Sequence, residues 1–194
     1  MESTSYSLLD RLRHNAQPDD WRKLVELYEP WIHDWLCRQG LQEHDAADVT
    51  QEVLAVVVQE LPSFEYDRQR GRFRGWLRTI TVNRLRAFWK SRRRQPVSSD
   101  DSNYEEILQQ LADPSSDLSR QWDEEHDLYL VQRTLERIRP EFRSSTWDVF
   151  DAHTMQGKPA DEVAQHFGIT RNAVYIAQSR VLARLREELQ GLCD

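Results

Sequence analysis

The sequence is poor in features typical of secreted, membrane-spanning and metal-binding proteins. It has only two cysteines, Cys37 and Cys193, which are far apart and form no C-x-x-C motif, so we expect ordinary reduced thiols. No stretch approaches 18 consecutive apolar residues, as a transmembrane helix requires. The N-terminus lacks the apolar core of a secretory signal, and the six histidines show no pairing typical of metal ligands. These absences predict a cytoplasmic protein with no membrane insertion, no metal and no cofactor.

Acidic and basic residues are separated along the chain, although the net charge is −7. Residues 41–67 contain seven acids and no Lys or Arg, whereas residues 68–94 contain eleven Lys or Arg and no acid. Residues 95–127 then contain ten acids and a single cation, Arg120. A basic block of this kind can bind phosphates through counterion release whatever the global charge. A solvated helical face is the alternative interpretation.

The spacing of apolar residues predicts helices throughout. One helix is expected over 19–38, with Asp19 or Asp20 as N-cap, a kink or local unwinding at Pro30 and termination at Gly40. A second is expected over 45–61, and a third begins near Phe73.

The later half divides into a linker and a second set of helices. Residues 95–120 are rich in Ser, Asp and Pro, which indicates a linker with at most a short helix over 104–111. A further helix begins near Trp122, and Pro140 should open another that ends near Phe150. We therefore predict an all-α protein with two small helical domains joined by an acidic flexible linker. The expected limits are an N-terminal extension 1–18, a first domain 19–95, a linker 96–121 and a second domain 122–194. The apolar face of the second domain's first helix is expected to carry Leu128, Val131, Leu135 and Ile138.

Residues 160–179 have the pattern of a helix-turn-helix. Ala164 is small enough for a close helix crossing, and Gly168 permits the positive φ that a tight turn requires. Thr170 is positioned to cap the second helix, which would then present polar side chains to the major groove of DNA. An ordinary structural hairpin is the alternative. The positions expected to be buried are Val163, Phe167, Ile169, Val174 and Ala177.

Together the two modules resemble a small sigma factor of the extracytoplasmic-function type, which contains only the second and fourth sigma regions. The resemblance covers roughly residues 20–94 and 125–190. It implies binding to the bacterial RNA polymerase core, at the β′ clamp and the β flap, and to promoter DNA, and it leaves an anti-sigma factor open as a further partner. In DAADVTQEVL it assigns core binding to Asp48, Gln51 and Glu52. In FRGWLRTITVNRLRAFWKSRRR it assigns −10 binding and melting to Arg74, Trp76, Arg78, Asn83, Arg84, Arg86, Lys90, Arg92 and Arg93. In the helix-turn-helix it assigns −35 binding to Thr170, Arg171, Asn172, Tyr175, Gln178, Ser179, Arg180 and Arg184.

The chain departs from the pattern of that family at two places. Ala87 stands where the family often carries an acid, and Tyr175, Ile176 and Ala177 stand where it usually carries more polar or basic residues. The recognition helix is therefore less cationic than the resemblance leads one to expect, and its DNA sequence cannot be inferred by analogy.

Two other classes of protein fit parts of the sequence. A conventional helix-turn-helix regulator would use its N-terminal domain to bind a ligand or to dimerise. An enzyme acting on nucleic acid would need metal ligands, for which the acidic groups at 19–20, 100–101 and 123–127 are the candidates. Helix capping and solvation explain those groups better, so we expect no catalytic residues. A further hypothesis is that residues 95–127 fold back on the basic residues 68–94, with simple disorder as the alternative.

Overall fold

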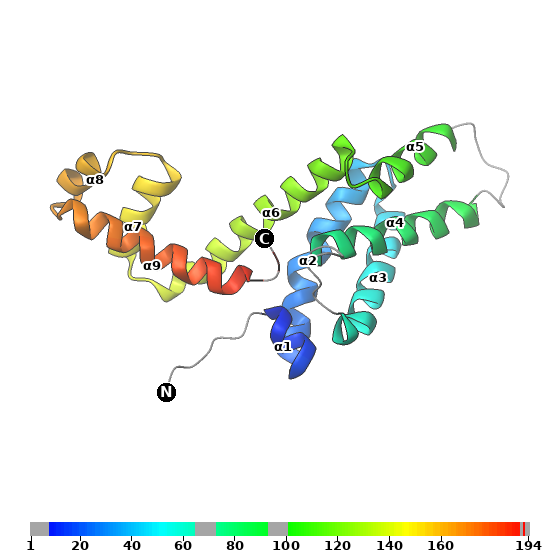
Figure 1. The fold of residues 1–194 in the computed structure, drawn as a ribbon, viewed down its shortest axis with the longest axis horizontal. Helices are drawn as coiled ribbons and strands as arrows, with labels where there is room; N and C mark the ends of the chain where they lie inside the picture. The colour runs from blue at the N-terminus through cyan, green and yellow to red at the C-terminus, as the bar shows by residue number, and fades with distance from the viewer. Residues whose placement is uncertain (1–7, 65–72, 93–100, 191, 193–194) are drawn as a thin grey trace. The chain divides into compact units, whose positions relative to one another are not determined.

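The computed structural model describes residues 8–64, 73–92, 101–190 and 192, without the side chains of 101–103. The elements in these ranges are helices (Figure 1), which confirms the predicted all-α class. The chain divides into two compact units. We call residues 6–130 the N-terminal unit and residues 131–190 the C-terminal unit. None of the helices in the described ranges is both long and apolar enough to cross a membrane.

The N-terminal unit begins with two helices, α1 (Leu8–His14) and α2 (Pro18–Arg38). The N-cap of α2 is Gln17, and Pro18 occupies the first turn, where its missing N–H costs nothing; the prediction of Asp19 or Asp20 as N-cap is therefore wrong. Asp20 instead accepts hydrogen bonds from the backbone N–H of Gln17 and the side chain of Arg11. Burial alone would raise the pKa of the Asp20 carboxyl, but these hydrogen bonds lower it below its ordinary value.

The end of α2 agrees with the prediction, but its middle does not unwind. The α-helix continues through Pro30 to Arg38, so the predicted local unwinding is wrong. Gly40 follows with φ +92°, a left-handed conformation that glycine adopts without a Cβ clash. The chain then enters α3 (Glu43–Glu60), which begins two residues earlier than expected, and a 3₁₀ turn (Leu61–Ser63) that contains Pro62.

The core of the N-terminal unit forms where α2, α3 and α4 (Phe73–Arg92) pack together. Their apolar faces supply fully buried side chains, among them Leu24, Ile32, Val53, Phe73 and Leu77. Burial of this kind is the main favourable contribution to the stability of such a bundle. Phe73 and Leu77 of α4 are thus core residues.

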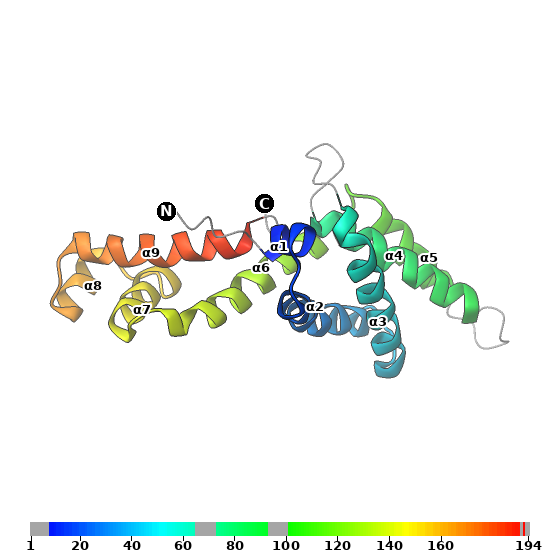
Figure 2. The same ribbon diagram turned by 90° about the horizontal axis from the view of Figure 1, so that it is seen from below.

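The segment expected to be a linker is helical over most of its described length. It forms α5 (Asp101–Ala112), which includes the short helix expected at 104–111, and the start of α6 (Asp117–Ile138). Tyr104 of α5 stacks on Trp89 of α4 with ring centroids 4.5 Å apart, and α4 and α5 run side by side in Figures 1 and 2. Trp122 of α6 is fully buried and lies edge-on to Trp31 and Trp35 at 4.6 and 4.5 Å. The sequence of this segment is polar on average, but a few large aromatic side chains pack it against the rest of the N-terminal unit.

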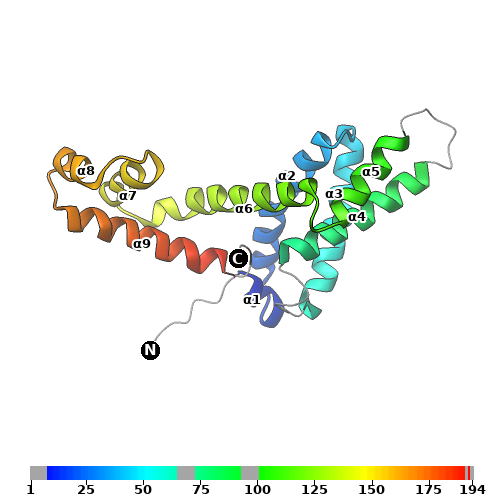
Figure 3. The ribbon, with the colours of Figure 1, turned by 45° about the horizontal axis from the view of Figure 1, so that its top comes forward.

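The C-terminal unit contains the end of α6 and the helix-turn-helix. A 3₁₀ turn (Arg139–Glu141) contains Pro140, and α7 (Ser144–Phe150) begins after it, so Pro140 does not open α7 as predicted. A π-helical turn (Asp151–Met155), α8 (Ala160–Phe167) and α9 (Arg171–Leu189) follow. Figure 3 shows α7 and α8 beside the N-terminal part of α9. The core of this unit is made by Val149, Ala152, Ala160, Val163, Ala164, Val174 and Ala177, with Phe167 packed against it.

Two apolar residues that were expected to be buried are exposed. Ile169 is 36% exposed because it lies in the turn between α8 and α9, outside the helix crossing. Leu128 is 59% exposed, whereas its neighbour Leu130 is fully buried. Leu135 and Ile138 of the predicted face of α6 are buried as expected.

Candidate nucleic-acid interface

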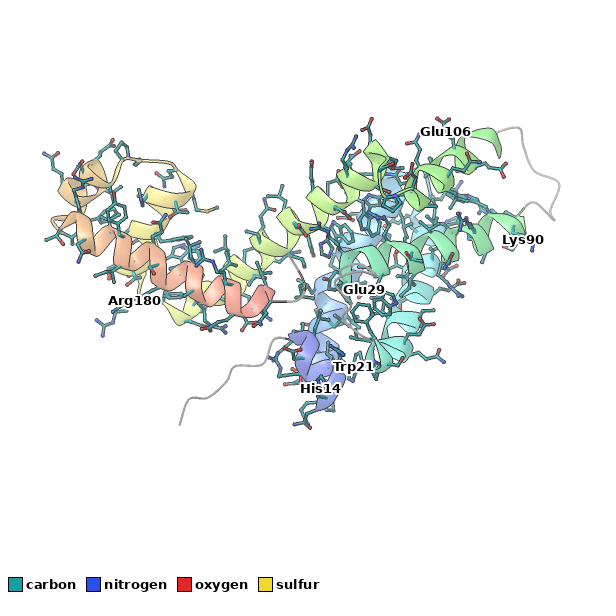
Figure 4. All side chains as sticks on the ribbon, viewed as in Figure 1. His14, Trp21, Glu29, Lys90, Glu106 and Arg180 are labelled. Carbon is teal, nitrogen blue, oxygen red and sulfur yellow. The ribbon has the colours of Figure 1, made fainter. Side chains whose placement is uncertain are left out.

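The exposed face of α3 carries Asp48, Gln51 and Glu52, the three residues predicted to bind the polymerase core. The opposite face is buried through Val49, Val53, Leu54 and Val57, which fixes the rotation of the helix. Because residues three and four apart lie on one helix face, the three polar side chains form a single surface. The side chain of Gln51 also donates a hydrogen bond of 2.8 Å to Glu29 of α2 (labelled in Figure 4).

Helix α4 carries the predicted −10 residues in three different environments. Asn83, Arg86 and Lys90 are exposed, and Figure 4 labels Lys90 near the C-terminal end of the helix. Arg84 is half-buried, and its buried Nε atom has no hydrogen-bond partner among the residues that the structure describes. Arg92 forms an ion pair of 2.7 Å with the buried Asp45 of α3. Arg93 lies outside the described residues.

The first turns of α4 face acidic residues of α6. Arg78 is only 8% exposed and donates hydrogen bonds to the carboxylate of Asp123 (2.8 Å) and the carbonyl oxygen of Ser119 (3.2 Å). Arg74 forms ion pairs with Asp123 (3.5 Å) and with Asp127. Arg74 and Arg78 were predicted to bind −10 DNA. In the structure their partners are instead carboxylates of the same chain.

A buried histidine extends this contact to α2. His126 is fully buried, and its Nε2 lies 3.2 Å from the hydroxyl of Tyr28 while its Nδ1 lies 2.9 Å from Asp127. Its ring also lies edge-on to that of Trp31. Sequence reasoning missed this role, because it interpreted the acidic residues at 123–127 as solvated. The one available signal was a histidine and a tryptophan within an otherwise acidic run.

A cavity of about 500 Å³ opens between α4 and α5. Its lining includes Arg86 and Lys90 from α4 and the stacked rings of Trp89 and Tyr104. Aromatic faces and cations together are what unpaired nucleotides bind, because each base offers a π-face and each link a phosphate. Trp76, the aromatic residue of the predicted −10 set, is half-buried and packs against Phe64, with ring centroids 4.7 Å apart.

The helix-turn-helix has the geometry that its sequence predicts. Gly168 ends α8 in the left-handed conformation, at φ 66° and ψ 34°. Thr170 is the N-cap of α9, and its hydroxyl accepts a hydrogen bond of 3.2 Å from the backbone N–H of Ala173. Thr170 therefore has a structural role whether or not it also contacts DNA.

The exposed face of α9 combines polar and apolar side chains. Asn172, Tyr175, Ile176, Ser179 and Arg180 are exposed, and the side chain of Arg180 extends away from the helix in Figure 4. Gln178 is half-buried and donates a hydrogen bond of 3.3 Å to Thr154 of the π-helical turn.

Two of the predicted −35 arginines have acidic partners. Arg171 forms an ion pair of 2.9 Å with Asp161 of α8, and both side chains are exposed. Arg184 makes a bidentate contact with Glu141 at 2.7 and 3.1 Å and a further ion pair with Glu188. The hydrogen bond with Glu141 is the main cause that raises the pKa of Arg184. Arg184 thus ties α9 to the 3₁₀ turn.

The described part of the chain holds no group of three or more His, Cys, Asp or Glu side chains arranged to bind a metal ion. The acidic residues considered as metal ligands at 123 and 127 instead pair with arginines.

Comparisons with known proteins find similarity to sigma factors. The family model for sigma-70 region 2 matches residues 24–95, which include most of α2 and all of α3 and α4. The ECF RNA polymerase sigma factor SigE of Mycolicibacterium smegmatis is 24% identical to this chain over 191 residues. That alignment covers 97% of this chain and 68% of the relative, so it includes the helix-turn-helix.

Proposed function

The chain belongs to the sigma-70 family, in its extracytoplasmic-function type, and from that premise we propose that it directs promoter recognition and DNA opening by RNA polymerase. Membership of this family gives it a role in transcription initiation through RNA polymerase, and this role needs no catalytic site of its own. The finer assignments concern which surface binds the polymerase core, which binds the −10 element and which binds the −35 element.

One observation carries the proposal. Within the segment that matches region 2, an acidic exposed face of α3 and a basic exposed face of α4 lie on different helices that pack against each other. Two surfaces of opposite charge suit two different partners, a protein and a nucleic acid. We propose that Asp48, Gln51 and Glu52 bind the β′ clamp of the polymerase core.

The basic face of α4 is proposed to bind and melt the −10 element. The exposed Asn83, Arg86 and Lys90 are its strongest members, because their side chains are open to solvent and DNA can reach them. Holding single-stranded DNA requires cations for the phosphates and aromatic faces for the bases. Arg86 and Lys90 supply such cations, and both line the cavity between α4 and α5.

The C-terminal unit is proposed to read the −35 element with α9 in the major groove and to bind the β flap. A second helix that follows a Gly turn and a Thr cap is the reading helix in this class of motif. Its exposed Asn172, Ser179 and Arg180 are the donors and acceptors available for base edges and phosphates. The same proposal includes a cytoplasmic location for the protein and an anti-sigma factor as a further partner.

The contact between α4 and α6 supports a masking role in the free protein. Asp123 and Asp127 neutralise Arg74 and Arg78, which are predicted −10 residues. DNA or the polymerase core would have to displace this part of α6 before those arginines could bind phosphates. We therefore propose that the acidic residues of α6 reduce non-specific DNA binding until the protein joins the polymerase.

Pull-down of purified polymerase core tests the proposal at α3. The double variant Asp48→Lys, Glu52→Lys should lose core binding by at least tenfold, because both carboxylates of the proposed contact change sign. The control is Glu60→Lys, which makes one such charge reversal at an exposed position about two turns further along α3. Equal core binding by the wild type and the double variant would contradict the assignment. Failure of the wild type to bind the core at all would overturn the proposed function.

A further inference from the structure

An isoleucine occupies the centre of the exposed face of α9. Ile176 is 44% exposed, and it lies one helical turn after Asn172 and one turn before Arg180, both of which are also exposed. The neighbouring Tyr175 is exposed to the same extent, but its ring lies edge-on to His153 of the π-helical turn, with centroids 5.7 Å apart. Ile176 is therefore the apolar side chain best placed to meet a partner of α9.

The charged groups of α9 do not compete for this central position. Arg171 is held by Asp161 at the start of the helix, and Arg184 by Glu141 and Glu188 further along it. Gln178 is turned toward Thr154. The exposed face of α9 thus carries the apolar Ile176 between the polar Asn172 and Arg180. This pattern suits a groove that presents one apolar group among hydrogen-bonding groups.

The major groove of DNA presents such a group at one base only. Thymine carries a C5-methyl there, while the other three bases present hydrogen-bond donors and acceptors without a methyl. We propose that Ile176 is a specificity-determining residue that selects a thymine in the −35 element by contact with its C5-methyl group. This inference rests on the proposed function, because it requires α9 to lie in the major groove of that element.

The experiment removes the methyl group without changing base pairing. Preferred −35 sequences are first selected from a randomised promoter library with the reconstituted holoenzyme. Each −35 thymine is then replaced in turn by deoxyuridine, which retains the hydrogen-bonding edge of thymine and lacks only its C5-methyl. Open-complex formation is measured as a function of holoenzyme concentration for the wild type, for Ile176→Ala and for Ile169→Ala. Ile169→Ala is the matched control, because the same side chain is removed from an exposed position in the turn before α9.

The proposal predicts one thymine position at which deoxyuridine weakens the wild-type holoenzyme by about fourfold, the effect of one buried methyl-sized group. At that position Ile176→Ala should bind the thymine and deoxyuridine promoters equally, while Ile169→Ala should keep the fourfold difference. The far-ultraviolet circular dichroism of both variants should match that of the wild type.

Three results would overturn the inference while leaving the proposed function intact. They are a selected −35 element without thymine, a wild type indifferent to deoxyuridine at each thymine, and an unchanged fourfold difference in Ile176→Ala. A holoenzyme that initiates without any −35 preference would overturn the −35 assignment of the proposed function, and the inference with it.

Discussion

The two helices proposed to face DNA, α4 and α9, differ in how their charge is used. In α4 the sequence is strongly basic, yet Arg74, Arg78 and Arg92 are paired with acidic residues of the N-terminal unit. In α9 the sequence is only weakly basic, and its paired arginines leave an apolar centre on the exposed face. A count of cations along the sequence therefore overstates the charge that either helix offers to phosphates, by three arginines in α4 and by two in α9.

The largest expected effect tests whether α6 belongs to the N-terminal unit. Trp122→Ala should lower the free energy of unfolding of this unit by about 3–5 kcal/mol, because a fully buried indole is removed from between Trp31 and Trp35. Hydrogen exchange of peptides from α2 and α6 measures this loss. Leu128→Ala is the control on the same helix and should change stability by less than about 0.5 kcal/mol, since Leu128 is exposed. A loss below about 1 kcal/mol in Trp122→Ala would show that α6 is not docked as described.

The turn before α9 gives the next largest effect. Gly168→Ala should destabilise the C-terminal unit by about 1–2 kcal/mol, because a Cβ is strained at φ +66°. Hydrogen exchange of peptides from α8 and α9 provides the measurement. Gly75→Ala offers a control with the opposite sign, because Gly75 lies inside α4 with open space around its Cβ position. It should stabilise the N-terminal unit by about 0.5–1 kcal/mol. A change in stability of the same sign in both variants would contradict the left-handed conformation of Gly168.

The masking of α4 predicts a gain of DNA binding. The double variant Asp123→Asn, Asp127→Asn should raise non-specific affinity for DNA about tenfold at low salt and steepen its salt dependence by roughly two phosphate contacts. The reason is that α6 loses the carboxylates that hold it over Arg74 and Arg78, so DNA displaces it more easily. Fluorescence anisotropy over a salt series measures both quantities. The control is Asp117→Asn, whose partner Arg120 is an exposed neighbour on the same helix; it should leave both unchanged. An unaltered salt slope in the double variant would count against masking.

The smallest expected effect concerns the start of α9. Thr170→Ala removes the hydroxyl that accepts a hydrogen bond from Ala173, which should cost about 1 kcal/mol of stability in the C-terminal unit. Thr170→Ser keeps the hydroxyl and should retain most of that stability. If promoter binding falls equally in both variants while stability is unchanged, Thr170 acts through DNA contact rather than as a cap.

Local signals predicted most of the helices and the helix-turn-helix. Gly40, Gly168 and Thr170 act through their own backbone or their nearest neighbours, so a single sequence is sufficient to place them. The same holds for the exposed face of α3, because its valines fix which side is buried.

The role of the acidic segment could not be predicted in the same way. Whether Asp123 meets water or Arg78 depends on a contact between residues 45 positions apart. Average composition indicated a linker, whereas the position of α6 depends on single buried side chains such as Trp122 and His126. The pairing of Arg184 with Glu141 is likewise a tertiary contact, 43 residues apart, that no periodicity reveals.

Reconstituted initiation tests the central claim most directly. The protein is added to polymerase core on a negatively supercoiled library of promoter regions, and unpaired thymines are mapped with permanganate. The account predicts open complexes at a defined set of promoters that share −10 and −35 elements, with none from core alone. Sequence-specific binding to duplex DNA without polymerase, together with no new open complexes in its presence, would contradict it.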